Sequence, residues 1–163
     1  MTDIDRAKAM LPSMPDEAFD LWIRHCVSKT GWPYQQVTDL GDEYWQGYFL
    51  DIPLLSIQSL QWDRRIIPFD IHLFENATGV MVQKMVLLHA HNFNPGVMVP
   101  ADSKGRFDSA VSYIKEHAEI PSSIVLLSTP HGFKIFDGWH RIAAVHSLQQ
   151  SVHPMELSCW IAS

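Results

Sequence analysis

The stretch KIFDGWHRIAAVHSL, residues 134–148, decides the fold of this chain, and the motif Asp137-Gly138-Trp139-His140-Arg141 lies at its centre. The apolar residues before the motif are typical of a strand. The apolar residues after it recur with the spacing of a helix that ends near residue 149. The sequence therefore predicts a strand that ends at Asp137 and a helix that opens with residues 138–141.

The first turn of this predicted helix is suited to an anion. Its N–H groups and the positive end of the helix dipole attract a phosphate, and Gly138 permits a close approach to the backbone. Arg141 adds a forked cation, and His140 adds a donor that titrates near neutral pH. Asp137 suits the N-cap position. The alternative is an ordinary capped surface helix, because Asp-Gly is a common turn dipeptide.

The segments around the motif predict an α+β unit of strands and helices. Apolar runs on either side of a Thr-Pro-His-Gly turn predict a hairpin, and a loosely alternating run near residue 160 predicts a closing strand. The predicted strands are residues 51–57, 124–127, 133–136 and 155–161, and a predicted helix covers residues 107–117.

This order of elements resembles the ParB/sulfiredoxin-like superfamily. The resemblance extends from residue 51 to residue 162. Its first pieces are Ile52-Pro53-Leu54-Leu55-Ser56-Ile57, the pair Arg64 and Arg65, and Ser112-Tyr113-Ile114-Lys115-Glu116-His117. Its later pieces are residues 121–127 and 133–136, the motif with Ala143 and Ala144, and the terminal strand. The resemblance implies an α+β fold, a small mixed sheet with packed helices. It also implies that the turn of the motif holds nucleotide phosphates.

The resemblance implies a nucleoside triphosphate, ATP or CTP, as the cofactor, with Mg²⁺ carried in with it. The residues implied to bind the nucleotide are Gly138, Trp139, His140, Arg141, Arg64 and Arg65. The implied catalytic residues are Asp137, His140 and Arg141. Asp137 would cap the helix or act as a general base or metal ligand, and His140 would donate a hydrogen bond and carry a proton. Arg141 would be the cation that neutralises charge on the phosphates. An ordinary solvated pair is the alternative for Arg64 and Arg65.

The motif also departs from the best-known members of the superfamily. Sulfiredoxins place a catalytic cysteine where this chain has Trp139, and Cys26 and Cys159 lie outside the motif, which argues against sulfinate reduction. Two functions remain. The first is an enzyme, namely an ATPase or other nucleoside triphosphatase, a phosphotransferase or, as a variant, a nuclease. The second is a non-enzymatic inhibitor or adaptor from a plasmid, phage or other mobile element that binds a protein partner.

Composition limits the class of protein and of partner. The 163 residues are 47% hydrophobic and 18% charged, which predicts a globular protein. A formal net charge of −6 disfavours binding to a long nucleic-acid duplex, although Arg64, Arg65, Lys104, Arg106 and Arg141 would suit a local basic cleft. No apolar run predicts a membrane span, and the acidic start lacks a signal-peptide pattern, so we expect a cytoplasmic protein.

The remaining segments complete the predicted organisation. Residues 1–50 are expected to form an N-terminal helical and aromatic extension that packs on a domain at 51–163, with a helix at 15–27 and aromatic residues at 39–50 as a cap or a partner-binding segment. Residues 69–105 resemble an insertion, with a helix at 76–90 and a lid-like loop at 92–105. Met81, Met85 and Met98 are expected to fill the core. His89 and His91 lie two apart, which suits no helical metal site.

Overall fold

The computed structural model of the protein describes residues 1–32, 52–149 and 155–163. It shows a mixed α+β fold with a four-stranded sheet, so the predicted α+β class is confirmed. The chain divides into two compact units, which we call the helical unit (Met1–Asp63 with Ala162–Ser163) and the sheet unit (Arg64–Ile161). The predicted boundary between residues 50 and 51 and the aromatic segment at 39–50 lie outside the described residues.

The helical unit begins with two helical segments. Helix α1 (Asp3–Met10) has a capping box in which Thr2 and Asp5 bind each other's backbone N–H groups. Helix α2 (Asp16–Ala18), the π-helical turn η1 (Phe19–Ile23) and helix α3 (Arg24–Thr30) then form one continuous helical stretch. This stretch confirms the helix predicted at 15–27.

The strand predicted at 51–57 is wrong, because Leu54–Gln58 form the short helix α5. Pro53 starts this helix, and its carbonyl accepts from the N–H groups of Ser56 and Ile57. Ile57 is buried, whereas Leu55 is 75% exposed, so the apolar run is not covered on both sides as a central strand would be. The strand of this region begins later, at Trp62.

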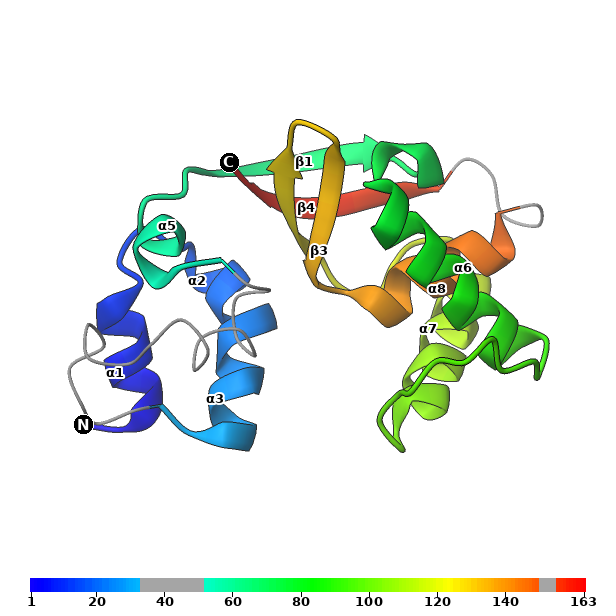
Figure 1. Cartoon of the computed structure of the whole chain (residues 1–163), viewed down its shortest axis with the longest axis horizontal. Helices are drawn as coiled ribbons and strands as arrows, with labels where there is room; N and C mark the ends of the chain where they lie inside the picture. Colours follow the sequence, from blue (N-terminus) through cyan, green and yellow to red (C-terminus); the bar gives the residue numbers. More distant parts are fainter. Residues whose placement is uncertain (33–51, 150–154) are drawn as a thin grey trace. The chain divides into compact units, whose positions relative to one another are not determined.

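The sheet contains β1 (Trp62–Pro68), β2 (Ile124–Thr129), β3 (Gly132–Asp137) and β4 (Glu156–Ala162). Their order is β1-β4-β2-β3, which places β1 and β3 at opposite edges. Strands β2 and β3 pair antiparallel as a hairpin, as predicted (Figure 1). Beside β1 and β4, Gln61 and Ser163 exchange backbone hydrogen bonds, which is an antiparallel pairing.

Three long helices accompany this sheet, preceded by the turn η3 (Ile71–Leu73). Helices α6 (Asn76–Ala90), α7 (Ser103–His117) and α8 (Trp139–Leu148) pack against one another (Figure 1). The predicted helix at 76–90 is confirmed, and its packing on α8 makes the predicted insertion part of the core. Helix α7 begins four residues before the predicted 107, so the predicted loop at 92–105 ends at Asp102. The core includes Val82, Met85, Phe107, Ile114, Leu126, Ile135, Ile142, Ala143 and Leu157.

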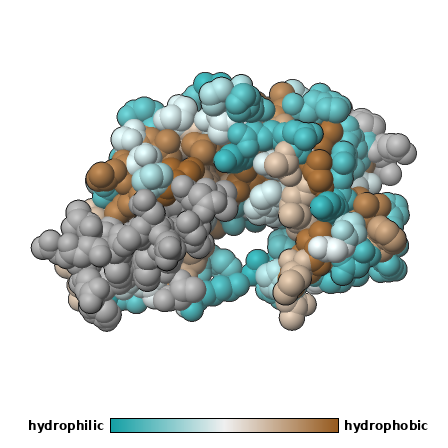
Figure 2. Space-filling view, in the orientation of Figure 1, coloured by the Kyte–Doolittle hydropathy of each residue, from teal (hydrophilic) through white to brown (hydrophobic). Residues whose placement is uncertain are grey.

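Several hydrophobic side chains of the sheet unit are exposed. Val80, Met81, Leu87, Phe93 and Met98 lie on α6 and in the loop after it, and Ile66 on β1 and Leu73 in η3 are exposed as well. Figure 2 shows hydrophobic and hydrophilic residues side by side in the region of α6. The prediction that Met81 and Met98 fill the core is wrong, because their side chains are 38% and 99% exposed on the surface, whereas Met85 is buried as predicted. Among the described residues, no helix combines the length and the apolar character needed to cross a bilayer.

Candidate functional site

The motif lies at the junction of a strand and a helix. Strand β3 ends at Asp137, and α8 begins at Trp139, which confirms the predicted placement. The N-cap residue is Gly138, with φ 114° and ψ 15°, and α8 has no side-chain hydrogen bond at its N-cap. The prediction that Asp137 is the N-cap is therefore wrong by one position. Asp137 instead faces Arg141, one helical turn later.

Gly138 is required by its conformation and by its neighbour. A positive φ of this size is rarely adopted by residues with a side chain. A Cβ atom at Gly138 would also lie 2.5 Å from Cγ2 of the buried Ile124. The glycine thus lets the turn pack directly on β2. The predicted role of Gly138, a close approach of phosphate to the backbone, stays a prediction, because the space that a side chain would take is filled by Ile124.

Arg141 connects the motif to the segment before β2. Its Nη2 atom donates to Asp137 Oδ2 at 2.6 Å and to the Ser123 carbonyl at 3.2 Å. Within the described residues, the buried Nε atom of Arg141 has no hydrogen-bond partner. The guanidinium therefore keeps donor capacity while two of its bonds fix its position beside the first turn of α8.

His140 belongs to a cluster that joins three helices. Its Nε2 atom lies 2.8 Å from Ser103 Oγ, and the same Oγ lies 2.8 Å from Nε2 of His89. Ser103 and His89 are buried, with 1% and 5% of their surfaces exposed. Ser103 is the first residue of α7, and His140 is the second residue of α8, so the N-terminal turns of the two helices meet.

The surroundings of His140 favour its neutral form. Burial lowers the pKa of His140 from 6.5 to about 4, and the nearby Arg106 adds to this effect. Arg141 lowers the pKa further, as would a proton on His89, and Asp102 opposes them. Burial also lowers the pKa of His89. Both rings are therefore neutral at pH 7, so each has one nitrogen that can accept a proton.

The two meeting helix ends create a local positive potential. Helix geometry leaves the N–H groups of residues 139–141 without an intrahelical partner, because the first such bond runs from Ile142 to Gly138. Neither α7 nor α8 has a side-chain hydrogen bond at its N-cap. Three cations lie on these turns, each paired with a carboxylate: Lys104 with Asp108, Arg106 with Asp102 and Arg141 with Asp137. Because these side-chain charges are balanced, the remaining positive potential comes from the backbone N–H groups of the first turns of α7 and α8.

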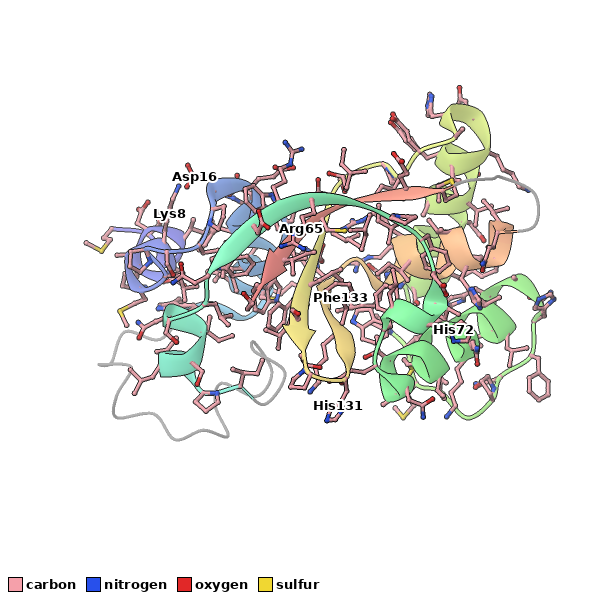
Figure 3. All side chains as sticks on the ribbon, turned by 90° about the horizontal axis from the view of Figure 1, so that it is seen from above. Lys8, Asp16, Arg65, His72, His131 and Phe133 are labelled. Carbon is pink, nitrogen blue, oxygen red and sulfur yellow. The ribbon has the colours of Figure 1, made fainter. Side chains whose placement is uncertain are left out.

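The structure places Arg64 and Arg65 away from the motif. Both lie on β1, and Figure 3 labels Arg65 on this strand. The motif follows β3, and two strands separate β1 from β3 in the sheet order. At about 4.8 Å between neighbouring strands, the two edges are about 14 Å apart. The structure therefore brings together Asp137, His140 and Arg141, without the paired arginines.

Sequence reasoning did not single out Ser103, and it considered His89 only as a metal ligand. A usable signal was present for Ser103: Pro100-Ala101-Asp102-Ser103 has the residue types of a helix start. The side chain of Trp139 is partly buried against the core, so its backbone N–H is the group that remains for the predicted contact with a phosphate. Cys159 is buried, and burial raises its pKa to about 12, which disfavours a reactive thiolate.

Among the described residues, no three His, Cys, Asp or Glu side chains are grouped so that they could hold a metal ion. Compared with known proteins, the chain matches no family model, no curated protein and no solved structure.

The buried histidines make the stability of the protein depend on pH. Because the folded pKa of His140 lies near 4 and its ordinary value is 6.5, the unfolded chain binds more protons between these values. The free energy of unfolding should therefore fall as the pH drops from 7 to 5, and His89 acts in the same direction. Urea unfolding at both pH values measures this. In the double variant His89→Gln/His140→Gln, the difference in the free energy of unfolding between pH 7 and pH 5 should be smaller. An unchanged difference would contradict the assignment of this pH dependence to the two histidines.

Proposed function

We propose that the protein binds a nucleoside triphosphate, ATP or CTP, with its phosphates at the first turns of α7 and α8, and hydrolyses or transfers the terminal phosphoryl group. In this proposal the chain is a stand-alone ParB/sulfiredoxin-like protein. The observation that carries the proposal is the 2.8 Å contact between Ser103 and His140, which joins two helix N-termini. Two such ends attract one anion more strongly than either does alone.

In this proposal, the residues of the motif make different contacts with the nucleotide. The N–H groups of residues 139–141 donate to phosphate oxygens, and Arg141, held by Asp137 and Ser123, supplies the fork of donors that matches a phosphate. Asp137 has a partly exposed carboxylate, the type of ligand that Mg²⁺ prefers when it arrives with a nucleotide. Bound Mg²⁺ would screen charge on the phosphates.

His140 is the residue best placed to move a proton. Its neutral ring can accept a proton from the attacking water or acceptor hydroxyl, and Ser103 fixes the orientation of the ring. A base with a pKa near 4 is weak, but a phosphate anion beside it favours the protonated form. Nucleotide binding should therefore raise the pKa of His140 toward neutrality, where general-base catalysis is most effective.

Replacing Arg141 by alanine should weaken nucleotide binding. We expect a loss of about 1.5–3 kcal/mol, the range for hydrogen bonds to charged groups, which is a roughly 10- to 150-fold rise in Kd. Calorimetric titration with ATP, ADP, CTP and GTP in the presence of Mg²⁺ measures it. Arg141→Lys keeps the positive charge but loses the forked donor geometry of the guanidinium, so its Kd should lie between those of the wild type and Arg141→Ala.

Arg64→Ala is the matched control for this experiment. It removes an arginine at the opposite edge of the sheet, so its Kd should stay within about twofold of the wild type, as for surface substitutions in general. Equal losses for Arg64→Ala and Arg141→Ala would contradict the placement of the phosphates. If the wild type binds none of the four nucleotides at millimolar concentration, the proposal itself is wrong.

The second candidate function is that of a non-enzymatic adaptor or inhibitor that binds a protein partner. The observation that favours it is the group of exposed apolar side chains on α6 and the following loop, which includes Leu87, Phe93 and Met98. Exposed apolar groups of this kind are common at protein-binding surfaces. Nucleotide binding without release of phosphate, with or without Mg²⁺, would favour this function.

A further inference from the structure

One buried hydroxyl is shared by two imidazoles in the sheet unit. Ser103 Oγ lies 2.8 Å from Nε2 of His140 on α8 and 2.8 Å from Nε2 of His89 on α6. A serine hydroxyl has one hydrogen, so it can donate to only one of the two rings. If both contacts are hydrogen bonds with neutral rings, the other ring must carry its proton on Nε2 and donate to Oγ. The two histidines are then opposite tautomers.

We propose that Ser103 passes a proton from His140 to His89, and this inference rests on the phosphoryl chemistry proposed above. In the resting state, Nε2–H of His140 donates to Ser103 Oγ, and the Ser103 hydroxyl donates to Nε2 of His89. In this proposal, the lone pair on Nδ1 of His140 is the one that accepts the proton from the attacking water or hydroxyl. Ser103 and His89 act through His140 as positioning residues and do not contact the nucleotide.

The transfer moves three protons, each along one hydrogen bond, and it involves no oxidation or reduction. Nδ1 of His140 takes a proton from the attacking water or hydroxyl, and the Nε2–H bond of His140 breaks as its proton joins Ser103 Oγ. The original hydroxyl proton of Ser103 moves to Nε2 of His89. His140 ends as the other neutral tautomer, and His89 ends as the imidazolium. The resting state returns when the Nε2 proton of His89 moves back through Ser103 Oγ to Nε2 of His140, and Nδ1 of His140 releases its proton to water or to the phosphate product.

The charged neighbours give the transfer its direction. His140 experiences two cations, Arg106 and Arg141, with Asp102 opposing them. His89 experiences one cation, Lys104, and the opposing carboxylate of Asp108. Burial lowers the pKa of both rings, and the balance of charged neighbours is the factor that favours the positive charge on His89 over His140. The same cations argue against a metal ion between the two rings, because they repel it.

The tautomers can be measured without any nucleotide. Long-range ¹H–¹⁵N NMR spectra at pH 7 should show the proton on Nε2 of His140 and on Nδ1 of His89. In Ser103→Ala, the link between the rings is lost, and His89 should shift toward the Nε2–H form. Ser147→Ala is the matched control, because it removes a hydroxyl of α8 that donates only to the Ala144 carbonyl; both tautomers should stay as in the wild type. The same tautomer in both wild-type rings would overturn the relay.

The kinetic test uses single-turnover hydrolysis across pH 5–9. His89→Gln keeps an amide within reach of Ser103 but cannot take up a proton. We expect kcat to fall about tenfold to a hundredfold in His89→Gln and in Ser103→Ala, at the low end of the range for acid–base groups, with Kd within about twofold. Ser103→Thr keeps the hydroxyl and should recover much of the rate. Wild-type rates and pH profiles in both His89→Gln and Ser103→Ala would overturn the relay.

The NMR and kinetic experiments together distinguish a failure of the proton relay from a failure of the proposed function. If no nucleotide binds to the wild type, the proposed function is wrong, and the relay as a catalytic device is overturned with it, whatever the tautomers. If nucleotide is hydrolysed and the tautomers are opposite, a loss of rate in His89→Gln supports the relay. If nucleotide is hydrolysed but the tautomers are equal, only the relay is overturned.

Discussion

The variant Gly138→Ala should lose much of the stability of the fold. The new side chain would adopt a φ near 114° and place its Cβ atom 2.5 Å from Cγ2 of Ile124, which is fully buried and cannot move aside freely. Strain at such a φ and overpacking of the core each cost about 1–3 kcal/mol, so we expect a total of about 2–6 kcal/mol. That is a large part of the 5–15 kcal/mol or so that stabilises a typical domain. Urea unfolding followed by circular dichroism measures the loss.

Gly105→Ala is the matched control for Gly138→Ala. Gly105 lies inside α7, and a Cβ atom there would meet nothing within 4 Å. Alanine is the better helix former by about 1 kcal/mol, so this variant should be as stable as the wild type or more so. If both variants unfold at the same urea concentration as the wild type, the close packing of Gly138 on Ile124 is wrong.

Replacing His140 by glutamine should greatly slow any nucleotide hydrolysis while nucleotide binding is retained. Glutamine keeps a polar group near Ser103 but cannot accept a proton, so it separates proton transfer from hydrogen bonding. We expect kcat to fall about 10²- to 10⁴-fold, the range for a general acid or base, and Kd to change by about threefold at most. Phosphate release and calorimetric titration provide the two measurements.

His131→Gln is the matched control for His140→Gln. Figure 3 shows His131 at the turn of the β2–β3 hairpin, where its side chain is exposed. Its rate should equal that of the wild type. If His140→Gln loses binding and turnover to the same degree, His140 is a hydrogen-bond donor to the nucleotide and carries no proton.

Local patterns in the sequence predicted the elements that surround the motif. The hairpin at β2 and β3, the start of α8 and the helix α6 follow from apolar spacing and turn residues that are close together in the chain. The short run at 52–57 was ambiguous, because four to six apolar residues suit a strand or a helix equally. Pro53 marks the start of the helix: it is the N-cap of α5, and its carbonyl accepts the first helical hydrogen bonds from Ser56 and Ile57.

The candidate site was only partly predictable. The motif predicted Asp137, His140 and Arg141, but the partners of His140 depend on tertiary packing. Ser103 is 37 residues from His140, and His89 is 14 residues from Ser103, so no local pattern links them. The place of Arg64 and Arg65 was also unpredictable, because it depends on a strand order in which β4 lies between β1 and β2.

This strand order has a consequence for the folding kinetics of the protein. Strand β4 is a central strand of the sheet, but its neighbour β1 is far away in the sequence. The hairpin of β2 and β3 and the adjacent α8 form from local contacts and need little loop closure, whereas β1 and β4 can pair only after a long loop has closed. We therefore expect the docking of β4 beside β2 and β1 to be the slow step of folding, and until it occurs the unpaired edge of β2 would be open to pairing with other chains.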